Sequence, residues 1–311
     1  MQPVVLMLNA LSDAHRAMIA AHCELIYAPG AKRASAIAEH GARINAVLTI
    51  GTIGLTAEEM QAMPHLELVC ALGVGYERID VAAARARGIA LGHGANTNAD
   101  SVADQAMALL LACVRQLPQN DRAARSGVRR ESLPMLPQLT GKKLGLVGLG
   151  AIGSTIARRA SGFDMPVGYH ARRPREGLAH RCFDSPLALA EWCDVLVLAA
   201  PGGPETHHMV NAEVLAALGP QGYLVNISRG SLVDTEALAA ALRSGGIAGA
   251  GLDVYESEPE PPQPLLDLQQ NLVLTPHVGG QSPESALAMV DRFIANLNGH
   301  FSGQGVVTPI P

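Results

Sequence analysis

Aromatic residues are scarce in this 311-residue chain, at 3%, and charged residues make up only 16%. No excess of basic residues is present: the formal net charge is −5. This balance argues against a protein that wraps duplex nucleic acid. The five cysteines are widely spaced and form no Cys-x-x-Cys pair. We therefore expect reduced thiols in a cytoplasmic protein, with neither a disulfide framework nor a metal site.

Long apolar runs are also missing. The most apolar stretch, Ala106 to Val114, is far shorter than the roughly 20 residues that cross a membrane. The chain begins without a basic segment before its first apolar run, so no signal peptide and no membrane partner are expected. The 48% of hydrophobic residues are nevertheless enough to bury sizeable cores, and the length suits two domains.

Short β-branched runs alternate with alanine-rich stretches of helical spacing, which predicts an α/β fold with parallel sheets. The predicted strands are Val4–Leu8, Leu25–Tyr27, Ala46–Ile50 and Leu66–Leu72, then Leu144–Val147, Val167–His170, Val195–Leu198, Leu224–Asn226, Ile247–Leu252 and Leu272–Leu274. We expect a first unit of about five strands and a second of about six. This pattern indicates two doubly wound, Rossmann-like or flavodoxin-like domains with a cleft between them.

Helical spacing is clearest in two further stretches. One runs from Ala99 to Leu117, where Pro118 is expected to stop the helix. The other is the closing segment Pro283–Leu297. The stretch Gln119–Thr140 is polar, rich in arginine and without periodicity. It is predicted to be an arm or loop, either a solvated connector or a contact between subunits.

A glycine-rich turn follows the predicted strand Leu144–Val147. It has the Gly-x-Gly-x-x-Gly spacing after an apolar strand and before an alanine-rich helix, the context that dinucleotide binding requires. The turn allows a pyrophosphate to approach the backbone and the amino end of the helix. The candidate phosphate-binding residues are Gly148, Gly150, Ala151, Ile152 and Gly153.

The acidic residue that usually binds the ribose hydroxyls about 20 residues further on is missing. Ala171 stands in its place, and Arg172 and Arg173 follow. A small residue beside guanidinium groups provides room and bidentate donors for a 2′-phosphate. The sequence therefore favours NADP(H), with NAD(H) as the second choice. The alternative is an ordinary basic loop.

Three polar clusters follow apolar strands of the second series and contain Arg229, Glu258 and His277. Singly, these residues are most simply a surface cation, a solvated acid and a core histidine. Together they form a coherent acid–base set, because the strand ends of one open sheet share an edge where ligands bind.

With these motifs the chain resembles the D-isomer-specific 2-hydroxyacid dehydrogenase family. The resemblance also covers Gly73–Asp80, Asn98–Asp104 and Pro204–Thr206, and in detail it is greatest to the NADP-dependent glyoxylate/hydroxypyruvate reductase branch. It implies that Arg229 binds the substrate carboxylate and polarises the carbonyl. It also implies that His277 is the acid/base and that Glu258 raises its pKa.

The resemblance assigns further roles as well. Residues 1–98 with 284–311 would form the substrate-binding domain, and 99–283 the dinucleotide-binding domain. The long helix and the arm would bury a homodimer interface. Beyond the glycine turn and residues 171–173, the implied cofactor contacts are Pro201, Thr206, Ile227, Asp253 (to the nicotinamide carboxamide), His277 and Gly279. The implied substrate contacts are Ile50, Gly51, Val74, Gly75, Arg229 and His277.

The leading functional hypothesis is reduction of a small 2-oxo acid to the D-2-hydroxy acid. A second keeps the fold but oxidises another small anion, as formate and phosphite dehydrogenases do. A third is a nucleotide-sensing binding protein, like the transcriptional co-repressors that share this fold. The sequence assigns no role to the flexible pair Gly202-Gly203 and does not identify the substrate side chain.

Overall fold

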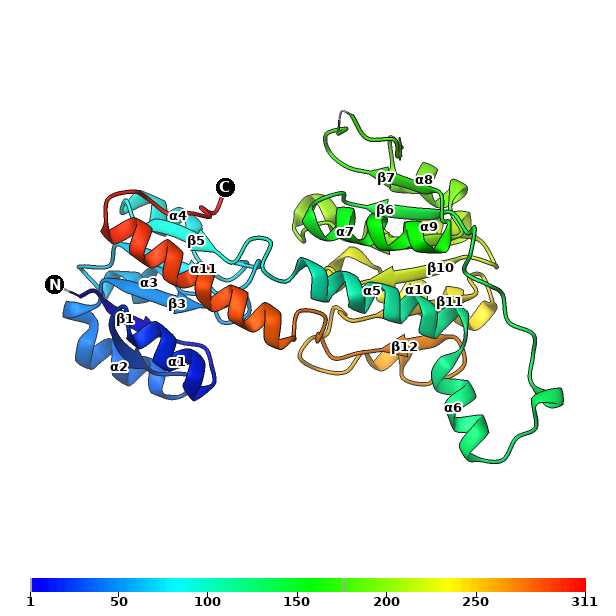
Figure 1. Ribbon diagram of the computed structural model, residues 1–311, viewed down its shortest axis with the longest axis horizontal. Helices are drawn as coiled ribbons and strands as arrows, with labels where there is room; N and C mark the ends of the chain where they lie inside the picture. Colours follow the sequence, from blue (N-terminus) through cyan, green and yellow to red (C-terminus); the bar gives the residue numbers. More distant parts are fainter. Residues whose placement is uncertain (1, 176) are drawn as a thin grey trace. The chain divides into compact units, whose positions relative to one another are not determined.

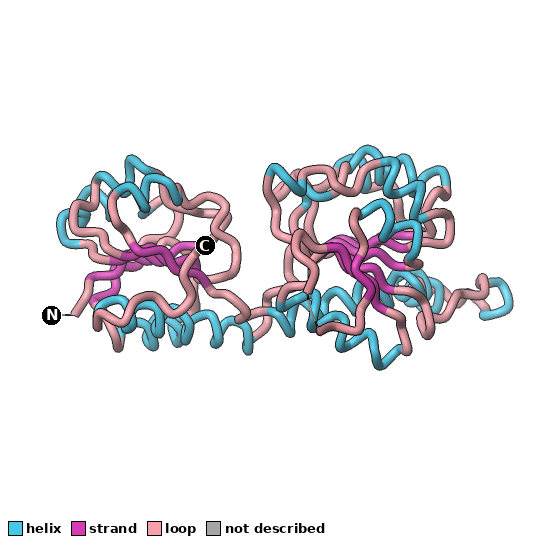
Figure 2. The backbone as a smooth tube through the Cα atoms, turned by 90° about the horizontal axis from the view of Figure 1, so that it is seen from above, coloured by secondary structure: helices cyan, strands magenta, loops and turns pink. Residues whose placement is uncertain are grey.

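Two compact units make up the computed structural model, which describes residues 2–175 and 177–311. Unit 1 contains the residues up to Asn98 together with Gln281–Pro311, and unit 2 is Ala99–Gly280. Each unit has a parallel sheet with helices on both faces (Figure 2). The predicted α/β fold class is confirmed. The assignment of substrate binding to unit 1 stays a prediction.

Unit 1 has a sheet with the strand order β2-β1-β3-β4-β5. The central strands are apolar and buried on both faces, as is typical of parallel sheets. Its strands are β1 (Val4–Met7), β2 (Glu24–Tyr27), β3 (Ala46–Thr49), β4 (Leu68–Ala71) and β5 (Ala90–His93). Its N-terminal helices are α1 (Asp13–Ala20), α2 (Lys32–His40), α3 (Ala57–Gln61) and α4 (Val81–Ala86). Of these strands, β5 was not located from sequence, because Ala-Leu-Gly-His has no β-branched residue.

The last helix, α11 (Pro283–Phe301), returns to unit 1 (Figure 1). Val290, Phe293 and Leu297 are buried and pack with Val5 and Met7 of β1. The chain end continues along β5, where the His93 backbone N–H donates to the Thr308 carbonyl at 3.0 Å. Unit 1 is thus closed by residues from both ends of the chain.

In unit 2, the described residues form a seven-stranded sheet of order β12-β11-β10-β9-β6-β7-β8. The sequence predicts six of these seven strands. The one that it does not predict is β8 (Arg181–Cys182), an exposed edge strand of two residues that is too short to show a pattern. The other strands are β6 (Leu144–Val147), β7 (Val167–His170), β9 (Val195–Leu198), β10 (Tyr223–Asn226), β11 (Gly249–Leu252) and β12 (Leu272–Leu274). The helices that cover this sheet are α5 (Ala99–Val114), α7 (Ala151–Ala160), α8 (Pro186–Trp192), α9 (Ala212–Leu218) and α10 (Thr235–Ser244). The strand order reverses between β6 and β9, where doubly wound sheets bind ligands.

The arm differs from its prediction. Helix α5 ends at Val114, and Pro118 lies in the first turn of a new helix, α6 (Leu117–Arg125), instead of ending one. Proline is tolerated there because the first-turn N–H has no partner within the helix. The first part of the predicted loop is therefore helical. Helix α6 extends away from the sheet of unit 2 (Figure 1) and has no buried residue.

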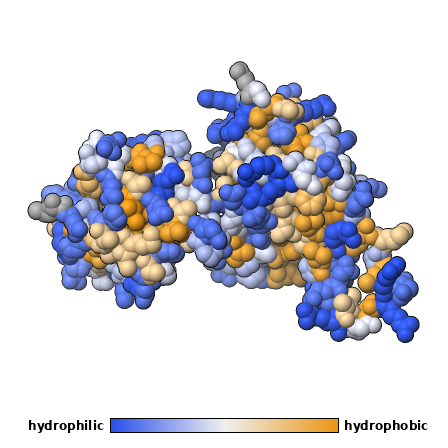
Figure 3. All heavy atoms as spheres, viewed as in Figure 1, coloured by the Kyte–Doolittle hydropathy of each residue, from blue (hydrophilic) through white to orange (hydrophobic). Residues whose placement is uncertain are grey.

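Apolar side chains remain exposed along this arm. Leu117 is 53% exposed and Met135 fully exposed, and the same region shows apolar atoms among hydrophilic ones (Figure 3). The homodimer stays a prediction. No helix among the described residues is long and apolar enough to cross a membrane.

Two leucines of α11 test the packing of the C-terminal helix. Leu297 is fully buried, whereas Leu287 on the same helix is 44% exposed. We expect Leu297→Ala to lower the free energy of unfolding of unit 1 by about 2–5 kcal/mol, because the truncation leaves a cavity. Leu287→Ala is the matched control and should change it by less than about 0.5 kcal/mol. Equal losses in urea denaturation would contradict this packing.

Candidate active site

The carboxyl ends of the parallel strands of unit 2 lie at one edge of its sheet, and the loops that leave them carry the predicted cofactor and catalytic residues. Loop positions on a rigid sheet edge are where open α/β proteins bind ligands. The loops after β6, β7, β9, β10, β11 and β12 therefore define the candidate site.

The glycine turn between β6 and α7 is tightly packed. Gly148 has φ 95°, and a Cβ there would lie 2.7 Å from the Ala199 carbonyl oxygen. A Cβ on Gly153 would lie 2.2 Å from the Gly148 carbonyl oxygen, so only glycine lets the helix approach the strand this closely. Gly150 has no side chain to cap α7, and space around its Cα is open. The amino end of α7, with Ala151 and Ile152, fits an anionic pyrophosphate.

After β7, Ala171 is half-buried and Arg172 extends into solvent. The Arg172 Nη1 lies 3.5 Å from Glu205 Oε2, and both side chains are about four-fifths exposed (81% and 78%). An exposed ion pair of this kind contributes little to stability. Arg172 can therefore leave Glu205 and bind another anion. Arg175, which was not among the predicted contacts, lies with its Nη1 3.5 Å from Ser154 Oγ on α7.

The loop after β9 is closed by Thr206, whose Oγ1 donates to the Pro201 carbonyl at 2.9 Å. Within this loop a Cβ on Gly202 would lie 3.0 Å from Arg229 Cγ and 3.3 Å from Arg229 Cβ. The pair Gly202-Gly203 had no role at the sequence level. The structure shows that Gly202 makes room for the aliphatic part of the Arg229 side chain.

Arg229 follows β10 in a loop that is held from several sides. The buried Asn226 accepts a hydrogen bond from the Ser228 N–H at 3.0 Å and donates to the Arg229 carbonyl at 2.9 Å. Ser228 Oγ in turn donates to the Ala200 carbonyl. A Cβ on Gly230 would lie 2.0 Å from the Tyr255 carbonyl carbon, so this loop packs directly on the next one. Ile227, which precedes Ser228, is buried.

Asp253 is only 2% exposed and organises the loop that carries His277. Its carboxylate accepts from Thr275 Oγ1 at 2.5 Å, from the Val278 N–H at 3.0 Å and from the Gly279 N–H at 2.8 Å. A carboxylate has about four acceptor positions, so most are used inside the protein. This anchoring role was not foreseen. A contact of Asp253 with the nicotinamide stays a prediction.

His277 and Glu258 form a hydrogen-bonded pair. Glu258 Oε2 lies 2.7 Å from His277 Nδ1, and Glu258 Oε1 accepts from the Tyr255 N–H at 2.8 Å. The hydrogen bond with Glu258 raises the pKa of His277 above its ordinary value, against burial and the charge of Arg229, which lower it. Because Nδ1 faces Glu258, Nε2 is the nitrogen that can exchange a proton with a substrate.

The four predicted substrate contacts of unit 1 lie at the carboxyl edge of that unit's sheet, after β3 and β4. A Cβ on Gly51 would lie 2.7 Å from the Gly75 carbonyl carbon, so the loops with Ile50-Gly51 and Val74-Gly75 touch each other. The Val74 carbonyl lies 3.0 Å from His93 Nδ1, which fixes the second loop. Their binding of substrate stays a prediction.

Comparison with known proteins supports the resemblance drawn from sequence. The NAD-binding domain of the D-isomer specific 2-hydroxyacid dehydrogenases matches residues 107–279. A 2-ketogluconate reductase of Gluconobacter oxydans is 42% identical over 272 residues, which cover 86% of each chain. A hydroxyphenylpyruvate reductase of Plectranthus scutellarioides is 39% identical over 86% of this chain and 85% of its own.

A solved structure shows the same likeness. It is an NADPH-dependent glyoxylate/hydroxypyruvate reductase of Sinorhizobium meliloti in complex with NADP and malonate. It superposes with a TM-score of 0.91 and is 39% identical, covering 100% of this chain and 97% of its own. The expected binding of a nicotinamide dinucleotide agrees with this structure and with the matched domain.

The contact between Gly202 and Arg229 can be tested by adding one methyl group. Gly202→Ala should lower kcat/KM for a 2-oxo acid about three- to tenfold, because Arg229 must shift by a few tenths of an ångström and misplacement at a site is costly. Gly162→Ala is the control, since a Cβ there meets nothing within 4 Å. The melting temperature should be unchanged in both. Wild-type kcat/KM in Gly202→Ala would show that Gly202 does not position Arg229.

Proposed function

The chain belongs to the D-isomer-specific 2-hydroxyacid dehydrogenase family, and from this premise we propose that it reduces a small 2-oxo acid to the D-2-hydroxy acid with NADPH. The observation that carries the proposal is the His277–Glu258 pair, at 2.7 Å, at the same sheet edge as Arg229. A protonated imidazole and a guanidinium are the groups that a carbonyl beside a carboxylate requires.

Arg229 binds the substrate carboxylate with its guanidinium fork and polarises the neighbouring carbonyl. The further proposed substrate contacts are the backbone N–H groups of Val74 and Gly75 and the residues Ile50 and Gly51, all in unit 1. When bound, NADPH supplies the hydride that the carbonyl carbon accepts. His277 Nε2 gives its proton to the carbonyl oxygen, and it takes the proton back in the reverse reaction.

The residues of the glycine turn bind the cofactor pyrophosphate, and Arg172 and Arg173 bind the 2′-phosphate. Pro201, Thr206, Ile227, Asp253 and Gly279 are the further proposed cofactor contacts. The amino end of α7, left uncapped by Gly150, supports the pyrophosphate position. Arg172 and Arg173 after β7 are exposed and stand where an acid would repel a phosphate, which supports NADPH over NADH.

A glyoxylate- or hydroxypyruvate-like acid is the proposed substrate class. The relatives are named for glyoxylate, hydroxypyruvate, hydroxyphenylpyruvate and 2-ketogluconate reduction. These compounds share a carboxylate beside a carbonyl. The test is consumption of NADPH with a panel of 2-oxo acids, ranked by kcat/KM. If no acid supports consumption, the nucleotide-sensing alternative takes the place of this proposal.

Cofactor choice can be reversed at two positions. We expect wild type to prefer NADPH, chiefly through KM, because a charge-assisted hydrogen bond to phosphate is worth about 1.5–3 kcal/mol, or roughly tenfold or more. Ala171→Asp with Arg172→Ala should reverse the preference, since the new carboxylate repels phosphate and accepts from a ribose diol. The control is Arg129→Ala on the arm. A wild type that favours NADH would contradict this assignment.

The Glu258 carboxylate should set the pH dependence of reduction. Reduction needs protonated His277, whose pKa this hydrogen bond raises. Glu258→Gln removes the charge, lowers the pKa of His277 and should move the basic limb of the kcat/KM profile to lower pH. Glu260→Gln, an exposed acid two residues further on, should leave the limb in place. An unmoved limb in Glu258→Gln would separate Glu258 from the acid/base.

A further inference from the structure

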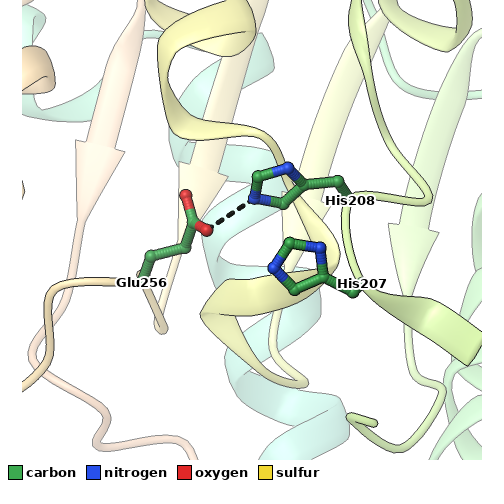
Figure 4. Close-up of side chains that lie close together, drawn as sticks. All are labelled: His207, His208 and Glu256. Carbon is green, nitrogen blue, oxygen red and sulfur yellow. Dashed lines mark hydrogen bonds and ion pairs between the residues drawn. The ribbon is translucent and has the colours of Figure 1, made fainter. Parts of the chain in front are cut away.

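A cluster of three side chains outside the proposed catalytic set holds metal-ligand atoms close together. His207 and His208 lie in the loop after β9, and Glu256 lies in the loop after β11 (Figure 4). One ligand atom from each residue lies within 4.8 Å of the others. We propose that His207, His208 and Glu256 bind a divalent transition-metal ion such as Zn²⁺. The sequence predicted no metal site, and the proposal does not depend on the reaction above.

The backbone brings the two adjacent rings to the same side. Successive side chains of an extended chain point in opposite directions. His208 instead has φ 49°, a left-handed conformation that is uncommon for a residue other than glycine. The imidazole rings stack with centroids 3.9 Å apart and an interplanar angle of 25°. Figure 4 shows both rings on the side of the Glu256 carboxylate.

Hydrogen bonds hold the ligands in position before any ion binds. His208 Nε2 lies 2.6 Å from Glu256 Oε1. The other oxygen, Glu256 Oε2, accepts from the Thr235 N–H at 3.2 Å and from Thr235 Oγ1. The His208 N–H donates to the Ser231 carbonyl at 2.8 Å. The contacts with Thr235 and Ser231 lie outside the ligand set. Outer partners of this kind orient metal ligands and are worth about 10–100-fold in metal affinity.

The donor set selects the class of ion. Two imidazoles and one carboxylate suit Zn²⁺, Co²⁺ and related ions, whereas Mg²⁺ and Ca²⁺ prefer oxygen ligands alone. His208 and Glu256 are 36% and 31% exposed, so water can complete the coordination. A simple hydrogen-bonded pair accounts for His208 and Glu256. It does not account for the third donor, His207, beside them.

The ion would link two loops of the candidate site. The loop of His207 and His208 contains Thr206, and the loop of Glu256 contains Glu258. The Arg229 loop lies between them, because Ser231 accepts from His208 and Gly230 packs against Tyr255. Binding to the folded state alone would stabilise it. We therefore expect Zn²⁺ to raise the melting temperature of the full chain.

The test is calorimetric titration of the chelator-treated full chain with Zn²⁺. Wild type should bind one ion, and His207→Asn should bind it at least about tenfold more weakly, since a ligand matters no less than its outer partners. His207 is exposed, so this variant should fold normally. His65→Asn, an exposed histidine of unit 1, and His277→Asn should keep the wild-type affinity. Equal affinity in wild type and His207→Asn, or loss of binding in His277→Asn, would overturn the proposal.

Co²⁺ gives an independent readout of the ligands. The visible spectrum of the Co²⁺ protein should show nitrogen and oxygen coordination that is lost in His207→Asn. A thiolate-to-cobalt charge-transfer band would instead place the ion at a cysteine, such as the exposed Cys182. That result would refute the proposed site. The Zn²⁺-dependent rise in melting temperature should likewise disappear in His207→Asn and persist in His65→Asn.

Discussion

The buried carboxylate of Asp253 is the constraint on which the rest of the site depends. A charge removed from water is costly unless hydrogen bonds replace the lost hydration. Here Thr275 and the N–H groups of Val278 and Gly279 replace it, and the Asp253 carbonyl accepts from the His277 N–H at 2.8 Å. Gln105 of α5 donates to Thr275 Oγ1 at 2.9 Å. Helix α5, through Gln105 and Thr275, therefore helps Asp253 to hold the backbone of His277 in its left-handed conformation, at φ 55°.

Backbone contacts do the same for the neighbouring loops. Gly153 lets α7 approach the Gly148 carbonyl, and Gly230 lets the Arg229 loop pack on Tyr255. Any side chain at either position would meet backbone atoms, which cannot move aside as a flexible side chain can. Side chains on such a framework are held more precisely than side chains on free loops. The strands beneath, β6, β9 and β10, are fully buried, so the loops start from fixed points.

Sequence reasoning was successful where the signal is local. The glycine turn lies within six residues, and the central strands are continuous apolar runs, so both could be read from spacing alone. Arg229, Glu258 and His277 could be grouped because each follows such a strand. Strand β8 and helix α6 lack an apolar pattern and were missed. The role of Asp253 and the cluster of His208 with Glu256, 48 residues apart, depend on which loops pack together. No local pattern encodes that.

The two pairs on the segment after β11 show how one loop can serve two purposes. Glu258 faces His277, whereas Glu256 faces His208 and Thr235. The His277–Glu258 pair is 43% and 26% exposed, and ion pairs at such positions add only about 0–1 kcal/mol to stability. Its consequence is therefore chemical: it favours the protonated imidazole. Asp253 is the opposite case, because three hydrogen bonds to its buried carboxylate hold the loop and leave about one of its four acceptor positions for a ligand. Structural and chemical roles are thus divided between neighbouring carboxylates.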